Sequence, residues 1–333
     1  MRIATYNVEW MNSLFADNGT LLNDTEWSAR YNVTREDQIA ALGVVFRALD
    51  ADAVLVIEAP DDNGDRSTTP ALEIFAEHMG LRARRAVIGF ANDTQQEIAL
   101  LYDPDVLRVR HDPQASETAP QFDTEFAIDL DIDATEDRVV FSKPPLELAV
   151  ETMGGFVFRM LGAHLKSKAP HGARGHDEIM RISIANRRKQ LAQAIWLRRR
   201  IDMHLAAGIP LMLLGDLNDG PGLDEYEGLF GRSSVEIVMG QGDTALFDPH
   251  ARQALQRRLG ASPTTARFFI RPEGRYLQAL LDYVMVSRDL AALSPQWRIW
   301  HPTDDPDCWG NAMLRDALLT ASDHFPVSLD IAL

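Results

Sequence analysis

Apolar residues recur along the chain in short runs separated by polar segments. The runs are rich in Val, Ile, Leu and Phe, and runs of roughly four to eight such residues favour buried β-strands. The candidate strands are Ile3–Val8, Ala53–Ile57, Glu97–Tyr102, Leu146–Val150, Phe156–Leu165, Pro210–Leu214, Asp282–Val286 and Phe325–Ile331. We therefore expect a protein with a large β component.

Longer segments between these runs carry the period of an amphipathic helix. The clearest are Arg35–Leu49, Pro70–Met79 and Asp177–Ala206. An apolar stripe at 3.6-residue period in the third segment contains Ile184, Leu191, Ala194, Ile201 and Leu205. That helix is expected to cover a sheet. Its basic clusters, 187–189 and 198–200, are expected to form a solvated outer face, in preference to a track for a phosphate backbone.

The order of these elements is mixed. Strands and helices alternate at first, then strand-like runs follow one another around 97–165, and a long helix and further strands come last. This order predicts an α/β (α+β) fold in which two mixed or antiparallel sheets pack face to face with helices outside. Segments rich in Gly, Pro, Asp and Asn are expected to be loops: 10–34, 60–69, 111–136, 218–232, 240–265 and 301–322.

Composition narrows the functional classes. The 333 residues are 46% hydrophobic and 25% charged, which is ordinary for a globular protein. Acidic residues outnumber basic ones by 49 to 33, giving a net charge of −16. Affinity for duplex nucleic acid comes largely from Lys and Arg at phosphates, so this charge argues against tight non-specific DNA binding. A local basic path remains compatible with it, and carboxylates gathered around a metal would add to the imbalance.

Nothing in the sequence indicates a secretion signal or a membrane span. The start moves directly into a strand-like pattern, and no apolar run approaches the roughly 18 residues that cross a bilayer. Cys308 is the only cysteine and forms no internal disulfide. We expect a cytoplasmic protein with no obligate protein partner, although a mature secreted form would have the same sequence.

Polar residues stand at one end of six of the apolar segments. Asn7, Glu58, His164 and the pair Asp216 and Asn218 close their runs, whereas Asp282 and the pair Asp323 and His324 open theirs. Each residue taken alone is more often a turn or cap residue. Strands that reverse direction across a sheet would nevertheless bring these ends and beginnings to one edge, and chance agreement of all six is not credible.

The combination resembles the endonuclease/exonuclease/phosphatase superfamily, which includes deoxyribonucleases, abasic-site endonucleases, sphingomyelinases and inositol polyphosphate 5-phosphatases. The segments that carry the resemblance are 5–7, Glu58, 164–168, 215–218, 282–283 and 322–327, in the family's order. The resemblance implies a deoxyribonuclease-like four-layer sandwich of two mixed, mainly antiparallel sheets with one active site at the sheet edges. Residues 1–333 would then form a single domain, because cutting the chain would split the site.

The chemistry of the side chains agrees with the roles that the resemblance implies. Glu58 supplies the hard oxygen that Mg²⁺ or Mn²⁺ prefers, and Asn7 and Asp323 would complete or orient that metal shell. Asp216 and Asn218 are two residues apart, so in an extended segment they would point to the same side and hold a water and a phosphate oxygen. Asp216 is the candidate for water activation.

Two histidines are candidates for acid–base chemistry. His324 needs a carboxylate to fix its tautomer and stabilise its imidazolium, and Asp282 matches the family's partner for it. His164 would contribute a second imidazole at the transition state or the leaving oxygen. The sequence leaves open which histidine donates a proton and whether one metal or two operate.

Substrate recognition is less determined. Lys143 resembles a family position that could meet substrate together with Asn218 and His164, but a solvated lysine at a strand start explains it equally well. Many family members have Gln before the metal-binding Glu and Asn before the first His, whereas Ile57 and Ala163 stand here. The missing Asn removes a possible phosphate contact.

The expected function is metal-dependent hydrolysis of a phosphodiester with nuclease-like activity, with nucleic acid as a candidate substrate. A phosphatase or phosphodiesterase acting on a small molecule, a nucleotide or a lipid headgroup is the close alternative, favoured by the −16 charge. A non-catalytic binding module of the same fold would show gaps among the metal ligands, and the sequence has none.

Overall fold

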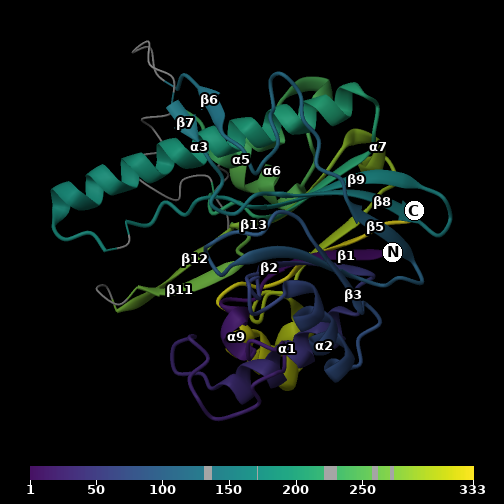
Figure 1. Ribbon diagram of the computed structural model, residues 1–333, viewed down its shortest axis with the longest axis vertical. Coiled ribbons are helices and arrows are strands. Elements are labelled where there is room, and N and C mark those ends of the chain that lie inside the picture. The colour runs from purple at the N-terminus through teal and green to yellow at the C-terminus, as the bar shows by residue number, and fades with distance from the viewer. Residues whose placement is uncertain (131–136, 171, 221–230, 257–261, 271–273) are drawn as a thin grey trace.

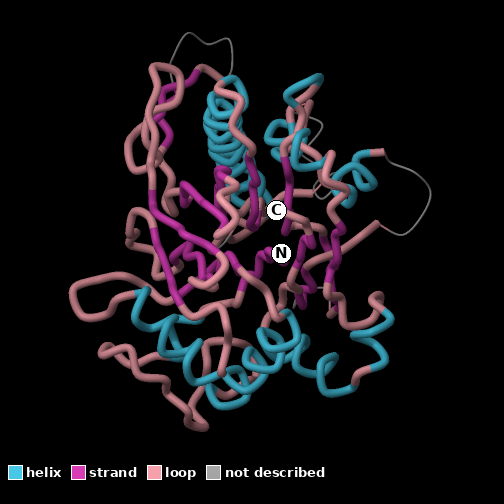
Figure 2. Tube along the Cα trace, turned by 90° about the vertical axis from the view of Figure 1, so that its right-hand side faces the viewer, coloured by secondary structure: helices cyan, strands magenta, loops and turns pink. Residues whose placement is uncertain are grey.

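In the computed structural model, two β-sheets pack face to face and helices cover both outer surfaces, which makes four layers (Figure 1). The structure describes residues 1–130, 137–170, 172–220, 231–256, 262–270 and 274–333. Figure 2 shows the strands between the two helical layers.

The first sheet has six strands in the order β14-β15-β1-β2-β4-β3. Only β1 and β2 run parallel, and every other neighbouring pair is antiparallel. Their bounds are β1 Arg2–Asn7, β2 Ala53–Ala59, β3 Arg85–Ile88, β4 Glu97–Tyr102, β14 Gln296–Ile299 and β15 Val327–Asp330.

The second sheet has five strands in the order β13-β10-β9-β8-β5. Here β9 and β10 form the parallel pair. The bounds are β5 Leu107–His111, β8 Leu146–Thr152, β9 Val157–His164, β10 Leu211–Asp216 and β13 Asp282–Val286. Two hairpins stand apart from both sheets: β6 Phe126–Ile128 with β7 Asp137–Val139, and β11 Ala266–Ile270 with β12 Arg275–Ala279.

Helices α1, α2 and α9 cover the first sheet, and α3, α5 and α6 cover the second. The bounds are η1 Met11–Leu14, α1 Arg35–Leu49, α2 Thr68–Met79, α3 His176–Ala206, α5 Ser234–Met239, η2 Gly242–Thr244, α6 Pro249–Leu255, α7 Arg288–Ala291, α8 Pro306–Gly310 and α9 Ala312–Ala321. No helix among the described residues combines the length and the apolar character that a membrane span requires.

Three apolar clusters hold the four layers together, two between a sheet and its helices and one between the sheets. The sheets approach closely at Gly162, where a Cβ atom would lie 2.6 Å from the Leu55 Cδ1 atom of the opposite sheet. A side chain there would force the sheets apart, because interiors are close-packed.

The expected α/β architecture of two mixed, mainly antiparallel sheets flanked by helices is confirmed. Several details were wrong. The segments 10–34, 111–136 and 240–265, expected to be loops, contain η1, β6 and α6. Residues 221–230 of the loop expected at 218–232 lie outside the described part of the chain. The segment 301–322, expected to be a loop, contains α8 and α9, whose caps Asp305 and Asn311 resemble turn residues in sequence. The basic clusters of α3 are not solvated throughout, because Arg187, Arg198 and Arg200 are buried.

Arg200 shows why a basic residue is buried in α3. Its guanidinium forms an ion pair with buried Glu147 and donates to the carbonyl oxygens of Ala119 and Pro120 at 2.9 and 3.0 Å. His204, one helical turn later, lies 2.7 Å from the same carboxylate. A buried charge is tolerated when it is paired and hydrogen-bonded, and periodicity alone does not reveal such partners.

Candidate active site

Glu58 lies on a β-bulge at the end of β2. The register with β4 shifts between Ile57 and Ala59, which leaves Glu58 as the extra residue with a φ of 63°. A bulge re-aims the side chain of the extra residue, and a non-glycine residue in the left-handed region costs of order 1–3 kcal/mol. The surrounding fold therefore holds this carboxylate in a strained position where it meets Asn7 and the Trp10 backbone.

Asn7 connects the two sheets. Its Nδ2 atom lies 3.5 Å from Glu58 Oε1 in its own sheet and 3.2 Å from Asp216 Oδ2 in the other sheet. Its backbone oxygen accepts a hydrogen bond from Ser322 Oγ at 2.7 Å. Residues far apart in sequence thus meet at the ends of the two parallel pairs, β1 with β2 and β9 with β10.

Asp216 and Asn218 come together through a turn. We expected an extended segment, but β10 ends at Asp216 and Asn218 has a φ of 50°. The Asn218 backbone N–H donates to Asp216 Oδ1 at 2.7 Å, and its Nδ2 lies 3.3 Å from Asp216 Oδ2. Asn tolerates this conformation, and the Asp216 carboxylate closes the turn by accepting from the Asn218 backbone, so the two side chains converge by a different route.

Gly215, directly before Asp216, has a φ of 132°, and a Cβ atom there would lie 2.0 Å from the Ala163 carbonyl oxygen of β9. Glycine at position 215 therefore allows β10 to lie close to β9, and the next residue, Asp216, places its carboxylate at the end of the strand.

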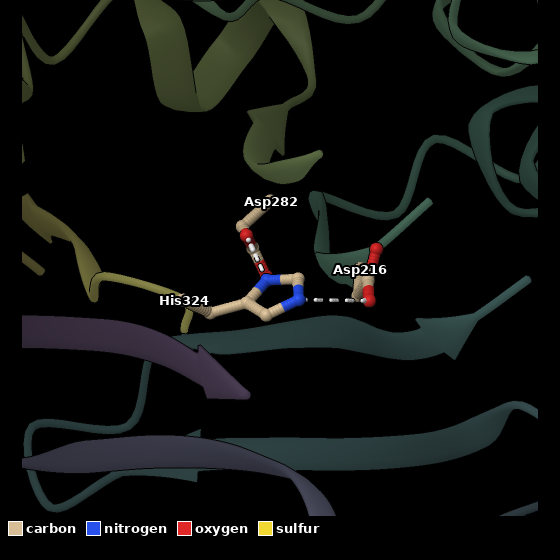
Figure 3. Close-up of side chains that lie close together, drawn as sticks. All are labelled: Asp216, Asp282 and His324. Atoms are coloured by element: carbon tan, nitrogen blue, oxygen red, sulfur yellow. Dashed lines mark hydrogen bonds and ion pairs between the residues drawn. The ribbon is translucent and has the colours of Figure 1, made fainter. Parts of the chain in front are cut away.

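His324 lies between two carboxylates, as Figure 3 shows. Its Nδ1 atom is 2.7 Å from Asp282 Oδ2, and its Nε2 atom is 3.9 Å from Asp216 Oδ2 and 3.9 Å from Asp323 Oδ1. Burial alone would lower the pKa of His324, but the carboxylates of Asp282, Asp216 and Asp323 together outweigh it, with Asp282 contributing most, and raise the pKa well above its ordinary value. Asp282 thus favours the imidazolium and orients it by a charge-assisted hydrogen bond.

His164 lies on the other side of Asp216, with Nε2 3.7 Å from Asp216 Oδ2. Lys143 Nζ approaches the same Nε2 atom at 3.0 Å and also donates to Gln96 Oε1 at 2.9 Å. Burial, reinforced by Lys143 and His324, lowers the pKa of His164 well below its ordinary value, so this imidazole is neutral. Burial also lowers the pKa of Lys143 to about 8. Lys143 is therefore a half-buried neighbour of the site and not a solvated lysine.

At two carboxylates of the site the effect of burial exceeds that of the neighbouring positive charges. Burial raises the pKa of Asp216 to about 7, and burial together with Glu9 raises the pKa of Asp323. Asp282 Oδ1 is buried and has no hydrogen-bond partner. Uncompensated buried carboxylates are costly, and a divalent cation would offset that cost. This donor set fits a hard cation.

Two groups of side chains offer ligand atoms for a metal. Asp216, Asp282 and His324 have ligand atoms within 4.8 Å of one another and could hold an ion. However, the His324–Asp282 hydrogen bond already uses two of these groups. Glu58 and Asn7, on the other side of Asp216, offer the oxygen-rich surroundings that Mg²⁺ prefers.

The structure places all of the sequence-derived candidates in one connected cluster. Contacts run from Glu58 through Asn7 to Asp216, and from Asp216 to Asn218, His164 and His324. His324 continues to Asp282 and Asp323, and Lys143 joins through His164.

Sequence reasoning missed Glu9 and Arg30. Glu9 Oε2 accepts a hydrogen bond from the Asp323 backbone N–H at 2.9 Å and pairs with the Arg30 guanidinium. Glu9 follows the Thr-Tyr-Asn segment by two residues, which is the only signal that could have identified it. Arg30 stands in a long loop with nothing nearby to distinguish it.

Such a cluster of carboxylates, amides and imidazoles, at the edge of a four-layer sandwich, is what a metal-dependent phosphoester hydrolase requires. The model of the Endonuclease/Exonuclease/phosphatase family matches residues 4–324. The chain therefore belongs to this family and is a phosphoester hydrolase. No curated protein gives a significant sequence match.

Solved structures of low sequence identity share the fold. TDP2 from Caenorhabditis elegans is 13% identical with a TM-score of 0.53, covering 100% of this chain and 74% of that one. A family protein from Bacteroides thetaiotaomicron is 13% identical with a TM-score of 0.51, covering 99% and 94%. TDP2 from D. rerio, complexed with a single strand DNA product, is 12% identical with a TM-score of 0.51, covering 100% and 99%.

Proposed function

We propose that the chain is a Mg²⁺- or Mn²⁺-dependent phosphodiesterase with nuclease-like activity. One observation carries the proposal: buried Asp216 is in simultaneous reach of Asn7, Asn218, His164 and His324, which come from both sheets. A carboxylate surrounded by an amide pair and two imidazoles suits the activation of water against a phosphate. The same reasoning supports a single domain over residues 1–333, and the cytoplasmic location stays a prediction.

In this proposal Glu58, Asn7 and Asp323 hold the metal. When bound, the metal neutralises a phosphate oxygen and stabilises the charge that develops during in-line attack. Asp216 accepts a proton of the attacking water while the water oxygen bonds to phosphorus. The bond from phosphorus to the leaving oxygen breaks, and that oxygen departs as an alkoxide that takes a proton from solvent. Asn218 fixes Asp216 and meets a phosphate oxygen.

The two imidazoles have different charges and therefore different tasks. His324 is protonated and donates to the phosphoryl oxygens, held by Asp282. His164 is neutral, and with Lys143 it faces the substrate on the other side of Asp216. The Lys143 ammonium at 3.0 Å from His164 Nε2 would repel a metal cation, so in this proposal His164 binds the leaving group.

A small-molecule, nucleotide or lipid-headgroup phosphoesterase is the second candidate. The net charge of −16 favours it, as does Ala163 in place of a possible phosphate-binding amide. The solved complex of D. rerio TDP2 with a single strand DNA product favours the nuclease-like alternative by analogy of fold. A non-catalytic module is disfavoured because the proposed ligands are present together.

The test is a substrate panel with purified protein and Mg²⁺ or Mn²⁺. Supercoiled plasmid, oligonucleotides, bis(4-nitrophenyl) phosphate and phosphomonoesters are compared with and without EDTA. We expect metal-dependent cleavage of diesters, and His324→Ala should lower turnover by ~10²–10⁴ with folding retained. Inertness of every nucleic acid would remove the nuclease-like assignment, and inertness of every ester would remove the hydrolase mechanism.

A further inference from the structure

The β11–β12 hairpin begins next to the candidate active site. Ala266 forms a β-bridge with His324, and the backbone N–H of Arg267 donates to the Asp323 carbonyl oxygen at 2.7 Å. Figure 1 shows the hairpin extending outward from the body of the protein. Phe269 is three residues beyond the bridge, which places it roughly 10 Å from His324 along a strand.

The two faces of the hairpin have different surroundings. Phe268 turns toward the catalytic side and packs edge-on against the His324 ring with a centroid separation of 5.5 Å. The opposite face carries Arg267, Phe269 and Tyr276, because side chains alternate along a strand and Phe269 pairs with Tyr276 across the ladder. The Arg267 backbone is bonded to that of Asp323, so this surface begins at the backbone of a proposed metal ligand.

That second face is an exposed aromatic surface, which we call the hairpin platform and define as Arg267, Phe269 and Tyr276. Phe269 and Tyr276 remain 48% and 50% exposed, with ring centroids 5.1 Å apart. The Arg267 guanidinium lies 3.5 Å above the centre of the Tyr276 ring. Leaving two large aromatic rings in solvent forfeits hydrophobic stabilisation, so their position beside a catalytic site indicates a ligand.

A third exposed aromatic residue stands at the metal end of the site. Trp10 is 40% exposed, and its backbone N–H donates to Glu58 Oε2 at 3.0 Å. Its φ of 57° is unusual for a bulky residue. The chain therefore accepts backbone strain at a partly exposed tryptophan whose backbone is bound to the proposed metal carboxylate.

We propose that the hairpin platform and Trp10 stack the bases of a single-stranded nucleic acid whose phosphodiester lies at His324 and Glu58. This inference rests on the proposed phosphodiesterase function and names its substrate. With a net charge of −16 the protein lacks the overall positive charge that attracts phosphates. Its affinity for a nucleic acid must therefore come from other interactions. Stacking on aromatic rings supplies it, and stacking requires bases that are unpaired.

Arg267 adds the cation that such a surface needs. A guanidinium stacked on Tyr276 presents its edges to a passing phosphate while its face stays on the ring. Duplex DNA offers its phosphates but keeps its bases paired, so it would gain little from these residues. Single strands are therefore expected to bind more tightly than duplexes of the same sequence.

The test measures binding separately from hydrolysis. Fluorescence anisotropy with a labelled single-stranded oligonucleotide in EDTA reports affinity without cleavage, and bis(4-nitrophenyl) phosphate with Mg²⁺ reports the catalytic centre without bases. Phe269→Ala, Tyr276→Ala and Trp10→Ala should each weaken oligonucleotide binding by about 5- to 150-fold, the range for loss of one stacked base. Tyr276→Phe, which keeps the ring, should restore binding.

Trp309 provides a matched control, since it is 57% exposed and has the Arg315 guanidinium 5.1 Å from its ring but belongs to α8. Trp309→Ala should leave both assays unchanged. The proposal is overturned if the three alanine variants bind single strands like wild type, or if duplex binds more tightly than single strand. If the wild-type protein does not hydrolyse bis(4-nitrophenyl) phosphate, the proposed function is overturned instead. Failure of the stacking proposal and failure of the proposed function are therefore distinguishable.

Discussion

Replacing Asp282 with Asn tests the role of the His324 pair. The change preserves the shape of the side chain but removes the charge 2.7 Å from His324 Nδ1, in a setting where both residues are buried. A charge-assisted hydrogen bond contributes about 1.5–3 kcal/mol, and one pKa unit corresponds to about 1.4 kcal/mol. The pKa of His324 should therefore fall by ~1–2 units in D282N.

The sign of this shift fixes the effect on activity. His324 acts protonated, so activity is lost as pH rises through its pKa, and a lower pKa moves the alkaline limb of the pH–rate profile to lower pH. We expect kcat/KM for bis(4-nitrophenyl) phosphate to show a limb displaced by ~1–2 units, with an unchanged Mg²⁺ midpoint. An alkaline limb at the wild-type position would refute the pairing, and a weakened Mg²⁺ midpoint would mean that Asp282 binds the metal.

Three further substitutions test other parts of the structure. Glu58→Gln should raise the Mg²⁺ concentration for half-maximal activity at least about tenfold with little change in thermal stability, and an unchanged titration would contradict its role as a ligand. Gly215→Ala should destabilise the fold by more than about 2 kcal/mol in urea denaturation, because its Cβ would lie 2.0 Å from the Ala163 oxygen. Arg200→Met leaves Glu147 without its cation and should cost about 3–5 kcal/mol in the same assay, a prediction that fails if the midpoint does not move.

The sequence predicted the sheets well because their signal is local. Buried strands such as Asp282–Val286 are nearly continuous apolar runs, and the ends of β1, β2, β9 and β10 each carry a polar residue. Those positions, together with the family resemblance, were enough to name the cluster of candidate residues. Their proposed roles in catalysis await the experiments above.

The features that sequence reasoning missed depend on contacts between distant segments. Glu9 is identified only by its contact with Asp323, and Arg30 only by Glu9. The burial of Arg200 depends on Glu147 in another element. The left-handed turn at Asn218 replaces an extended segment because the strand ends two residues earlier than an alternating pattern suggests. Tertiary contacts of this kind override local preference.

The hydrogen bond from Asn7 to Asp216 has a consequence for how this enzyme should lose activity under denaturing conditions. It spans the interface between the two sheets, so a small sliding of one sheet over the other would separate Asp216, the proposed base, from the proposed metal ligands before either sheet loses its hydrogen bonds. Enzymatic activity should therefore respond to a displacement of the two sheets that leaves the secondary structure unchanged. Low concentrations of denaturant should inactivate the enzyme while its far-UV circular dichroism spectrum is still that of the native protein.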